Sequence, residues 1–228
     1  MEGGHSIPPE AEEVLERAEP YGDRQFLCLV DGRVVGQRVR NEDGMLLEEW
    51  TERDGVRHGY DLHWDGSGRL TFETRYVEGR EHGLARQWQE GRLLGSYWME
   101  HGTGLDLWRS SDGSLLEERH CRDGERDGFE RWWNGDNRTV CREGHFRRGV
   151  PHGVFRVWNP RGRLRRGYPQ YFVIGRRVTK QAYLQAELVD SSLPYRGQRK
   201  RGYQLGPPQL RHALSSGPDR QFTRQTAP

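Results

Sequence analysis

The sequence predicts an all-β protein: an elongated, single-layer antiparallel sheet of about six tandem β-hairpins, with short terminal helices and a disordered C-terminal tail. Glycine recurs with a period of about 24 residues, which indicates an internal repeat. Two turns in each period leave segments of strand length rather than helix length. The hydrophobic share of 32% and the mean hydropathy of −1.03 are too low for a thick two-layer core.

The recurring glycines fall into three interleaved series. The first marks Gly-x-Leu turns at nearly equal steps along the chain: Gly44, Gly68, Gly91, Gly113, Asn137 and Gly162. The second follows the first by about half a period: Gly55, Gly79, Gly102, Gly124, Gly149 and Gly175. The third often follows a histidine: Gly36, Gly59, Gly83, Gly104, Gly128 and Gly153. Asn137 is the informative exception, because asparagine replaces glycine most readily at positive φ.

The segments between the turns alternate as β-strands do. Within residues 70–76, the apolar or aromatic side chains and Thr74 share one face, and the charged side chains with Thr71 share the other. Each period therefore predicts one hairpin, and hairpins of this kind stack mainly on their neighbours. The six predicted units are 32–55, 56–79, 80–102, 103–124, 125–149 and 150–175.

The two ends of such a sheet need covering, because a bare edge invites aggregation. Residues 1–21 form an acidic segment in which 8–20 predict a short helix that ends at Pro20. The repeat domain spans 22–175, and 176–194 predict a helical cap whose helix at 178–190 has Thr179 as its N-cap. Residues 195–228 have the composition of a disordered tail, with seven basic residues against one acidic.

The repeat carries a recurring motif: a His-Gly pair, a tryptophan five residues after the glycine, and a Gly-x-Leu turn. The motif occurs at His58-Gly59/Trp64/Gly68, His82-Gly83/Trp88/Gly91 and His152-Gly153/Trp158/Gly162, and more loosely at Asp127-Gly128/Trp133/Asn137 and Gly104/Trp108/Gly113. This motif resembles the variant MORN repeat of bacterial proteins named as antitoxin components of a toxin–antitoxin module. The resemblance covers about residues 32–175. It implies an antiparallel hairpin ribbon that binds a partner protein, and it implies no catalytic residue.

Three histidines, His58, His82 and His152, share one position of the repeat. Histidines of consecutive repeats cannot bind one metal ion between them, because equivalent positions in consecutive hairpins are about 10 Å apart. Ligand atoms of one zinc ion must lie within about 4 Å of each other. Other units have Val35, Thr103 or Asp127 at this repeat position. We therefore predict that the position has a structural role in the turn.

The cysteines are interpreted as packing residues. Cys28, Cys121 and Cys141 are odd in number and include no Cys-x-x-Cys pair, so neither a disulfide framework nor a zinc ribbon is expected. Cys121 and Cys141 fall at repeat positions that other units fill with apolar side chains. We expect no cofactor, no metal and no enzyme activity. The chain has no apolar run of membrane-spanning length and no signal-peptide pattern, which favours a reducing cytoplasm.

The tryptophans leave two interpretations open. Those of the motif are expected to pack along the sheet, although a row of aromatics on a single layer could also anchor a partner. The others fall outside the main repeat position and are better candidates for exposure and partner binding: Trp50, Trp98, Trp108 and Trp132.

These features together predict a bacterial, non-enzymatic interaction module. The most specific version of this prediction is an antitoxin or immunity-type protein that covers the functional surface of a cognate toxin. The alternative is a membrane-surface scaffold whose basic tail touches acidic phospholipids. Specific nucleic-acid binding is not expected, because charge without a folded groove gives only non-specific affinity. A hydrolase built on the ribbon is the weakest of the alternatives.

Overall fold

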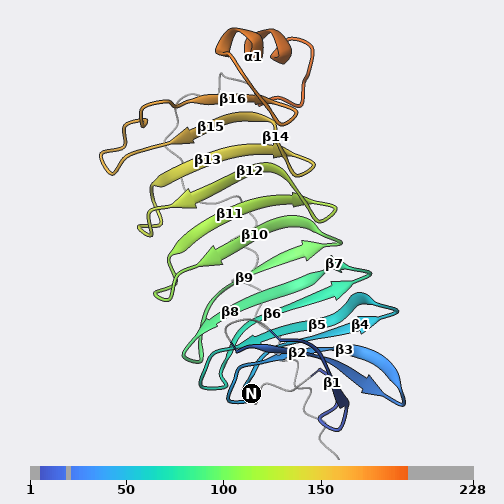
Figure 1. The fold of residues 1–228 in the computed structure, drawn as a ribbon. Helices are drawn as coiled ribbons and strands as arrows, with labels where there is room; N and C mark the ends of the chain where they lie inside the picture. Colours follow the sequence, from blue (N-terminus) through green and yellow to red (C-terminus); the bar gives the residue numbers. More distant parts are fainter. Residues whose placement is uncertain (1–5, 19–21, 195–228) are drawn as a thin grey trace, which may run out of the picture.

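The computed structural model describes residues 6–18 and 22–194. It shows one open antiparallel sheet of 17 strands that forms an elongated, twisted ribbon with one short helix at its C-terminal end (Figure 1). This confirms the predicted all-β, single-layer sheet of hairpins. The predicted basic tail at 195–228 lies outside the described residues.

Successive strands pair antiparallel, so the sheet is a meander. At two places a strand is interrupted: β7 and β8 both pair with β6, and β14 and β15 both pair with β13. The strands are β1 (Glu12–Ala18), β2 (Arg24–Val30), β3 (Arg33–Arg40), β4 (Leu46–Arg53), β5 (Val56–Trp64), β6 (Leu70–Val77), β7 (Arg80–Glu81), β8 (Gly83–Gln89), β9 (Arg92–Glu100), β10 (Thr103–Arg109), β11 (Leu115–Arg122), β12 (Glu125–Trp133), β13 (Val140–Arg147), β14 (Val150–Pro151), β15 (Gly153–Val157), β16 (Gln170–Val173) and β17 (Arg176–Val178).

One long edge of the ribbon, which we call the turn edge, carries two-residue turns. In each of them both central residues have positive φ, the geometry of a type I′ hairpin. The turn at the end of the first predicted unit, Asp54–Gly55, has φ values of 52° and 76°. The same pattern recurs along this edge at Asp31–Gly32, Glu78–Gly79, His101–Gly102, Asp123–Gly124, Arg148–Gly149 and Ile174–Gly175.

The opposite edge, the loop edge, carries mostly longer loops that an Asp or Asn side chain organises. Asp65 shows the pattern: its Oδ1 accepts hydrogen bonds from the backbone N–H groups of Ser67 at 2.8 Å and Arg69 at 3.0 Å. Asn137 has a φ of 54°, as its place in the glycine series predicts. Its Oδ1 also accepts a hydrogen bond from the backbone N–H of Leu115 at 2.6 Å.

The glycines of the third series, except Gly83, allow a close approach of neighbouring groups. Gly153 has a φ of 147°, and a Cβ there would lie 2.6 Å from the Cβ of His145. Gly36 differs because its φ is not positive, yet a Cβ there would lie 2.1 Å from the carbonyl oxygen of Trp50. Both contacts are too short for a side chain, so glycine is required at these positions for different local reasons.

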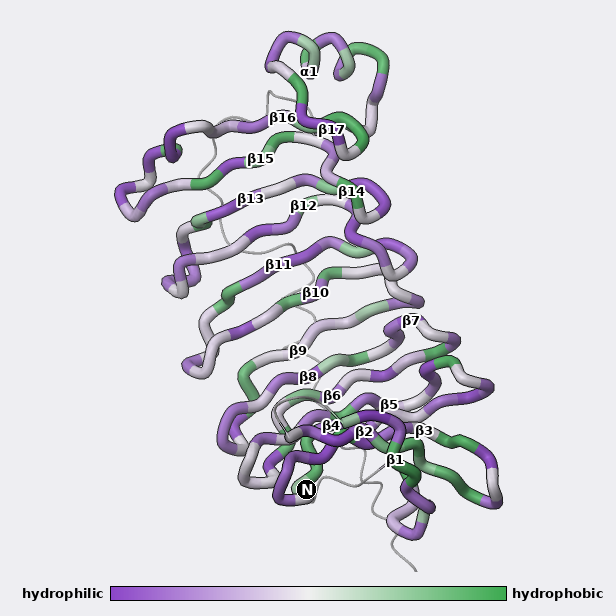
Figure 2. The backbone as a smooth tube through the Cα atoms, viewed as in Figure 1, coloured by the Kyte–Doolittle hydropathy of each residue, from purple (hydrophilic) through white to green (hydrophobic). Residues whose placement is uncertain are grey.

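The sheet has two faces, defined here by strand register. The groove face carries Trp50, Asp61 and Thr74, which are paired across β4, β5 and β6. The opposite face carries Glu49, Leu62 and Glu73 on the same strands. Along the opposite face, Arg and Glu alternate in ion pairs of 2.7–3.0 Å: Arg86–Glu73, Arg131–Glu118, Arg131–Glu143 and Arg156–Glu143. Hydrophilic residues accordingly dominate most of the ribbon (Figure 2).

The predicted N-terminal helix is wrong, because residues 12–18 form the edge strand β1. Glu13 on this strand accepts hydrogen bonds from the guanidinium groups of Arg38 and Arg40. Pairing with β2 and these ion pairs outweigh the helical propensity of a short acidic segment, which is marginal on its own. The preceding residues cover the opposite face, where Ile7 and Ala11 pack against Cys28.

The predicted C-terminal cap is confirmed. Helix α1 (Lys180–Glu187) begins after Thr179, whose Oγ1 accepts a hydrogen bond from the backbone N–H of Ala182 at 3.2 Å. Tyr183 is fully buried and packs against Val154 and Tyr171, so the helix covers the last hairpin. Both terminal segments therefore cover the opposite face, one at each end of the ribbon.

Candidate partner-binding groove

The repeat position shared by the histidines is a hydrogen-bond acceptor for the next turn along the ribbon. The backbone N–H of the first turn residue donates to its side chain: Glu78 to His58 at 3.5 Å, His101 to His82 at 3.2 Å, Asp123 to Thr103 at 3.1 Å, Arg148 to Asp127 at 3.4 Å and Ile174 to His152 at 3.1 Å. The next N–H, that of the turn glycine, donates to the carbonyl before the shared position, as Gly102 does to Glu81 at 2.7 Å. The histidines are therefore structural, as predicted. No group of three metal-ligating side chains occurs among the described residues.

Ser192, His152 and Asp190 form a cluster that resembles a nucleophile–base arrangement. The Nε2 of His152 lies 3.0 Å from the Oγ of Ser192 and 3.4 Å from the Oδ2 of Asp190. The Nδ1 of His152 accepts the hydrogen bond from Ile174, so the neutral ring carries its proton on Nε2. An Nε2 that carries a proton cannot take one from serine. The cluster therefore joins the cap to the last repeat and does not activate a nucleophile.

The cysteines occupy packing positions and are poor nucleophiles. Cys28 is fully buried, and burial raises the pKa of its thiol to about 11. Burial likewise raises the pKa of Cys121 to about 11. The Sγ of Cys141 donates to the carbonyl oxygen of Trp132 at 3.3 Å. A thiol with a raised pKa holds little thiolate at neutral pH, so Cys28 and Cys121 lack the reactive form.

The four tryptophans proposed for exposure do not form one surface. Trp50 is only 7% exposed, which corrects the prediction: the guanidinium of Arg57 stacks on its ring at 4.7 Å. Trp132 is half-buried beneath Arg142 at 4.4 Å. Trp98 and Trp108 are 60% and 46% exposed. They lie on opposite faces, Trp98 on the opposite face and Trp108 on the groove face.

The tryptophans of the motif are all half-buried: Trp64, Trp88, Trp133 and Trp158. They are therefore neither a closed core nor a freely exposed row. Trp88 lines a hollow on the groove face together with Trp108. This position allows one motif tryptophan to face a ligand as well as its own repeat.

Three adjoining hollows lie along β10, and we call them together the β10 groove. A hollow of about 480 Å³ lies at the turn edge and includes Gly102, Asp106 and Arg119. A middle hollow of about 280 Å³ is lined by Asp106, Trp108, Glu117 and Arg119. A hollow of about 310 Å³ continues from Trp108 toward the loop edge at Ser111. Adjoining hollows share lining residues, so the three follow one another from the turn edge to the loop edge.

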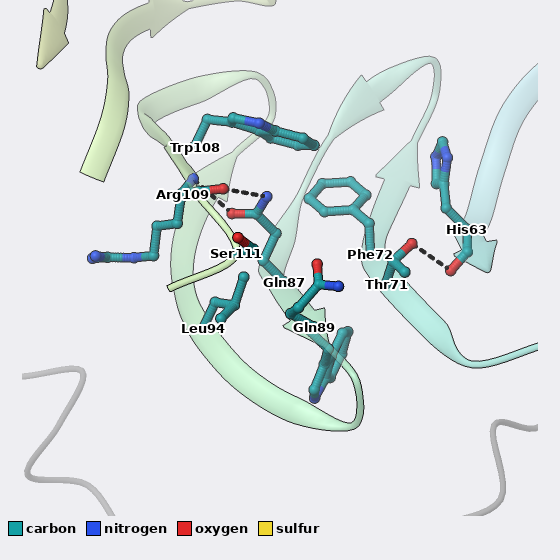
Figure 3. A pocket seen from close by; sticks show the side chains of 10 residues that line it. His63, Thr71, Phe72, Gln87, Gln89, Leu94, Trp108, Arg109 and Ser111 are labelled. Carbon is teal, nitrogen blue, oxygen red and sulfur yellow. Dashed lines mark hydrogen bonds between the residues drawn. The ribbon is translucent and has the colours of Figure 1, made fainter. Parts of the chain in front are cut away.

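The loop-edge end of the groove is aromatic (Figure 3). The rings of Phe72 and Trp108 lie 5.8 Å apart, and His63 meets Phe72 edge-on at 5.6 Å. The amide of Gln87 is held by the backbone of Arg109, donating to its oxygen at 3.5 Å and accepting from its N–H at 2.9 Å. These contacts fix the walls of the hollow before any ligand arrives, which reduces the entropy lost on binding.

His63 is a titratable group at this end of the groove. Burial lowers the pKa of its imidazole, but the hydrogen bond and charge of Asp61, with a further contribution from Glu48, raise it by more. The Nε2 of His63 lies 3.1 Å from Asp61 and its Nδ1 lies 3.6 Å from Glu48. The pKa of His63 is therefore above its ordinary value, because these two acids stabilise the protonated form of the ring.

The middle of the groove is rich in carboxylates. One guanidinium, that of Arg119, binds three of them: Asp106 at 3.1 Å, Glu117 at 2.5 Å and Glu130 at 3.1 Å. Burial raises the pKa of Asp106 and of Glu117. Arg126 also pairs with Glu130, at 3.4 Å, so two guanidinium groups face three carboxylates and the centre of the groove has an excess of acidic groups.

Sequence reasoning found Trp108 but missed the groove. Its remaining walls come from side chains that are far apart in the chain, such as Phe72, Gln87 and Glu117. The signal available in the sequence was the strand register, which places equivalent repeat positions in rows across the sheet. A hollow forms where the side chains of one unit differ from those at the same positions in the other units.

Comparison with known proteins does not assign the chain to a family. No protein-family model and no characterised protein matches the chain. The described part of the chain also contains no helix with the length and apolar character that crossing a membrane requires.

Proposed function

We propose that the protein is a non-enzymatic interaction module that binds a partner protein in the β10 groove. The observation that supports this most is Trp108, which is 46% exposed and borders two of the three hollows. An exposed tryptophan beside a preformed aromatic hollow has the features of a binding hot spot. The rigid repeat on either side holds this tryptophan in place.

In its finer form, the partner is a toxin whose functional surface the module covers. The support is the resemblance of the six-fold repeat to the variant MORN repeats of antitoxin components. The partner would then be encoded beside this gene, because toxin and antitoxin components are produced together. Relief of growth inhibition on co-expression tests this finer form separately from binding.

A protein partner is favoured over an acidic membrane by the charge of the groove. The carboxylates Asp106, Glu117 and Glu130 share one guanidinium, so the middle of the groove repels anionic headgroups. Basic groups that could meet such headgroups lie away from the groove, in the exposed arginines of residues 161–166 and in the segment 195–228, which is outside the described residues. Membrane binding would therefore not involve the groove.

The test is to co-express the full chain with the product of each neighbouring gene and to measure the affinity of any complex. Trp108→Ala should weaken binding about 30-fold, the factor that corresponds to a hot spot of about 2 kcal/mol. Trp98→Ala is the matched control, because Trp98 is 60% exposed on the opposite face. Equal affinity of the wild type and the Trp108 variant, or a loss confined to the Trp98 variant, would overturn the proposal.

A further inference from the structure

The turn-edge half of the β10 groove has more acid than base. Four carboxylates, those of Glu81, Asp106, Glu117 and Glu130, lie around the guanidinium groups of Arg119 and Arg126. The other two arginines that line the groove are engaged elsewhere: Arg80 pairs with Asp123 at 3.1 Å, and Arg109 donates to the carbonyl oxygen of Gly113 at 3.0 Å.

Glu81 is the carboxylate without a basic partner in the described part of the chain. It accepts a hydrogen bond from the Oγ1 of Thr74 at 2.9 Å and interacts with the hydroxyl of Tyr97. The same hydroxyl interacts with Asp106. A phenol has one hydrogen to donate, so it cannot satisfy both carboxylates at once. Burial raises the pKa of Glu81 by more than the hydrogen bonds of Thr74 and Tyr97 lower it, and the neighbouring acids raise it further.

The acidic and aromatic halves of the groove have a fixed spacing. Asp106 and Trp108 stand two residues apart on β10 and on the same face, a separation of roughly 6.6 Å along a strand. An extended polypeptide has the same repeat, so its side chains at positions i and i+2 would reach both halves. The turn-edge end is lined by Gly79, Gly102 and Gly124, which have no side chain to close it.

We propose that the β10 groove takes an extended segment of the partner protein that carries a lysine or arginine two residues from a large apolar side chain. The basic group lies between Glu81 and Asp106 and supplies the hydrogen-bond donors that Tyr97 cannot. The apolar side chain lies against Trp108 and Phe72. This inference rests on the proposed function and specifies the chemistry of the partner.

The probe is a phage-displayed library of random heptapeptides, selected on the full chain. The wild type should enrich peptides with a basic residue two positions from an aromatic or large aliphatic residue. Synthetic copies of these peptides should bind the double variant Glu81→Gln/Asp106→Asn at least tenfold more weakly, and the wild-type affinity should fall as salt rises. Peptides selected on the Trp108→Ala variant should no longer be enriched in the large apolar residue. Peptides selected on the Trp98→Ala variant should match those selected on the wild type. Arg119 keeps two acidic partners in the double variant, and its melting curve checks that it folds.

Two outcomes would overturn this inference. One is enrichment that lacks the paired residues or that is unchanged in the double variant. The other is enrichment only after Arg196, Arg199, Lys200 and Arg201 are changed to serine in the full chain, which would assign the groove to the basic segment of this chain. If partner binding depends on Trp108 but not on Glu81 and Asp106, the proposed function stands and this inference fails.

Discussion

The backbone N–H of His101 donates a hydrogen bond to the Nδ1 of His82 at 3.2 Å, so a side chain of one repeat holds the turn of the next. The same relationship joins Ile174 to His152 and, through other acceptors, Asp123 to Thr103. These turns have positive φ at both central positions and little packing of their own. The acceptor therefore couples neighbouring hairpins where the thin sheet offers few apolar contacts.

His82→Ala should destabilise the protein by about 1 kcal/mol, the usual contribution of one hydrogen bond. His82→Asn should recover part of the loss, because its amide oxygen can accept the same N–H, as the side chains of Asp127 and Thr103 do in their units. Urea denaturation of the three proteins measures the difference. Equal losses in the two variants would show that ring packing, not the acceptor, stabilises this turn.

The contribution of His152 to stability should be lost as the pH drops below about 6.5, the ordinary pKa of histidine. Burial lowers the pKa of His152, while Asp190 raises it and Arg147 and His145 lower it, for a net decrease. The unfolded chain therefore takes up a proton at a pH where the folded chain does not, and stability present above about pH 6.5 is lost below it. Melting temperatures at pH 7.5 and 5.5 measure this loss.

His152→Gln is the control for the pH effect. Glutamine keeps a hydrogen-bond acceptor near Ile174 but does not titrate, so the difference between the two melting temperatures should shrink. It should not vanish, because burial also lowers the pKa of His145. An unchanged pH dependence in this variant would remove His152 from the explanation.

Asn137 should be more sensitive to alanine than to glycine. Alanine must adopt its φ of 54°, at a cost of about 1–2 kcal/mol, and it also loses the hydrogen bond to Leu115. Glycine loses only the hydrogen bond, about 1 kcal/mol. The order of stability by thermal melting should be wild type, Asn137→Gly, then Asn137→Ala. An alanine variant as stable as the glycine variant would contradict the conformational argument.

Glu49→Ala should destabilise the N-terminal end by about 1–3 kcal/mol, because it removes one of the two carboxylates that pair with the buried guanidinium of Arg38 and leaves only Glu13. The carboxylate also accepts hydrogen bonds from the backbone N–H groups of Ser6 and Ile7, so the covering segment should detach. Hydrogen exchange at residues 6–18 measures the detachment. Glu48→Ala, at a more exposed neighbouring site, should change stability by less than about 1 kcal/mol.

The repeat made most of the fold predictable. A turn with positive φ restricts its residues so strongly that the glycine series, with Asn137 in place, specifies both edges of the ribbon. The C-terminal helix was visible in its Thr179 N-cap. The N-terminal strand was not, because β1 depends on the unpaired edge of β2 and on two arginines of β3, Arg38 and Arg40, which are distant in the sequence.

The candidate site was only partly predictable. The exposure of Trp98 and Trp108 followed from their place outside the main repeat position. The burial of Trp50 depends on the stacked guanidinium of Arg57, a contact across strands that the repeat period alone does not specify. The groove likewise requires the side chains of Phe72 and Trp108 to be placed relative to each other.

Site-specific photocrosslinking tests the central claim, partner binding in the β10 groove, most directly. A benzophenone amino acid is placed at Ser111, which lines the aromatic hollow, or at Tyr60, which is 46% exposed on the opposite face. With the partner bound, crosslinks should form from position 111 and not from position 60. Crosslinks from position 60 alone would place the partner on the opposite face and contradict the account.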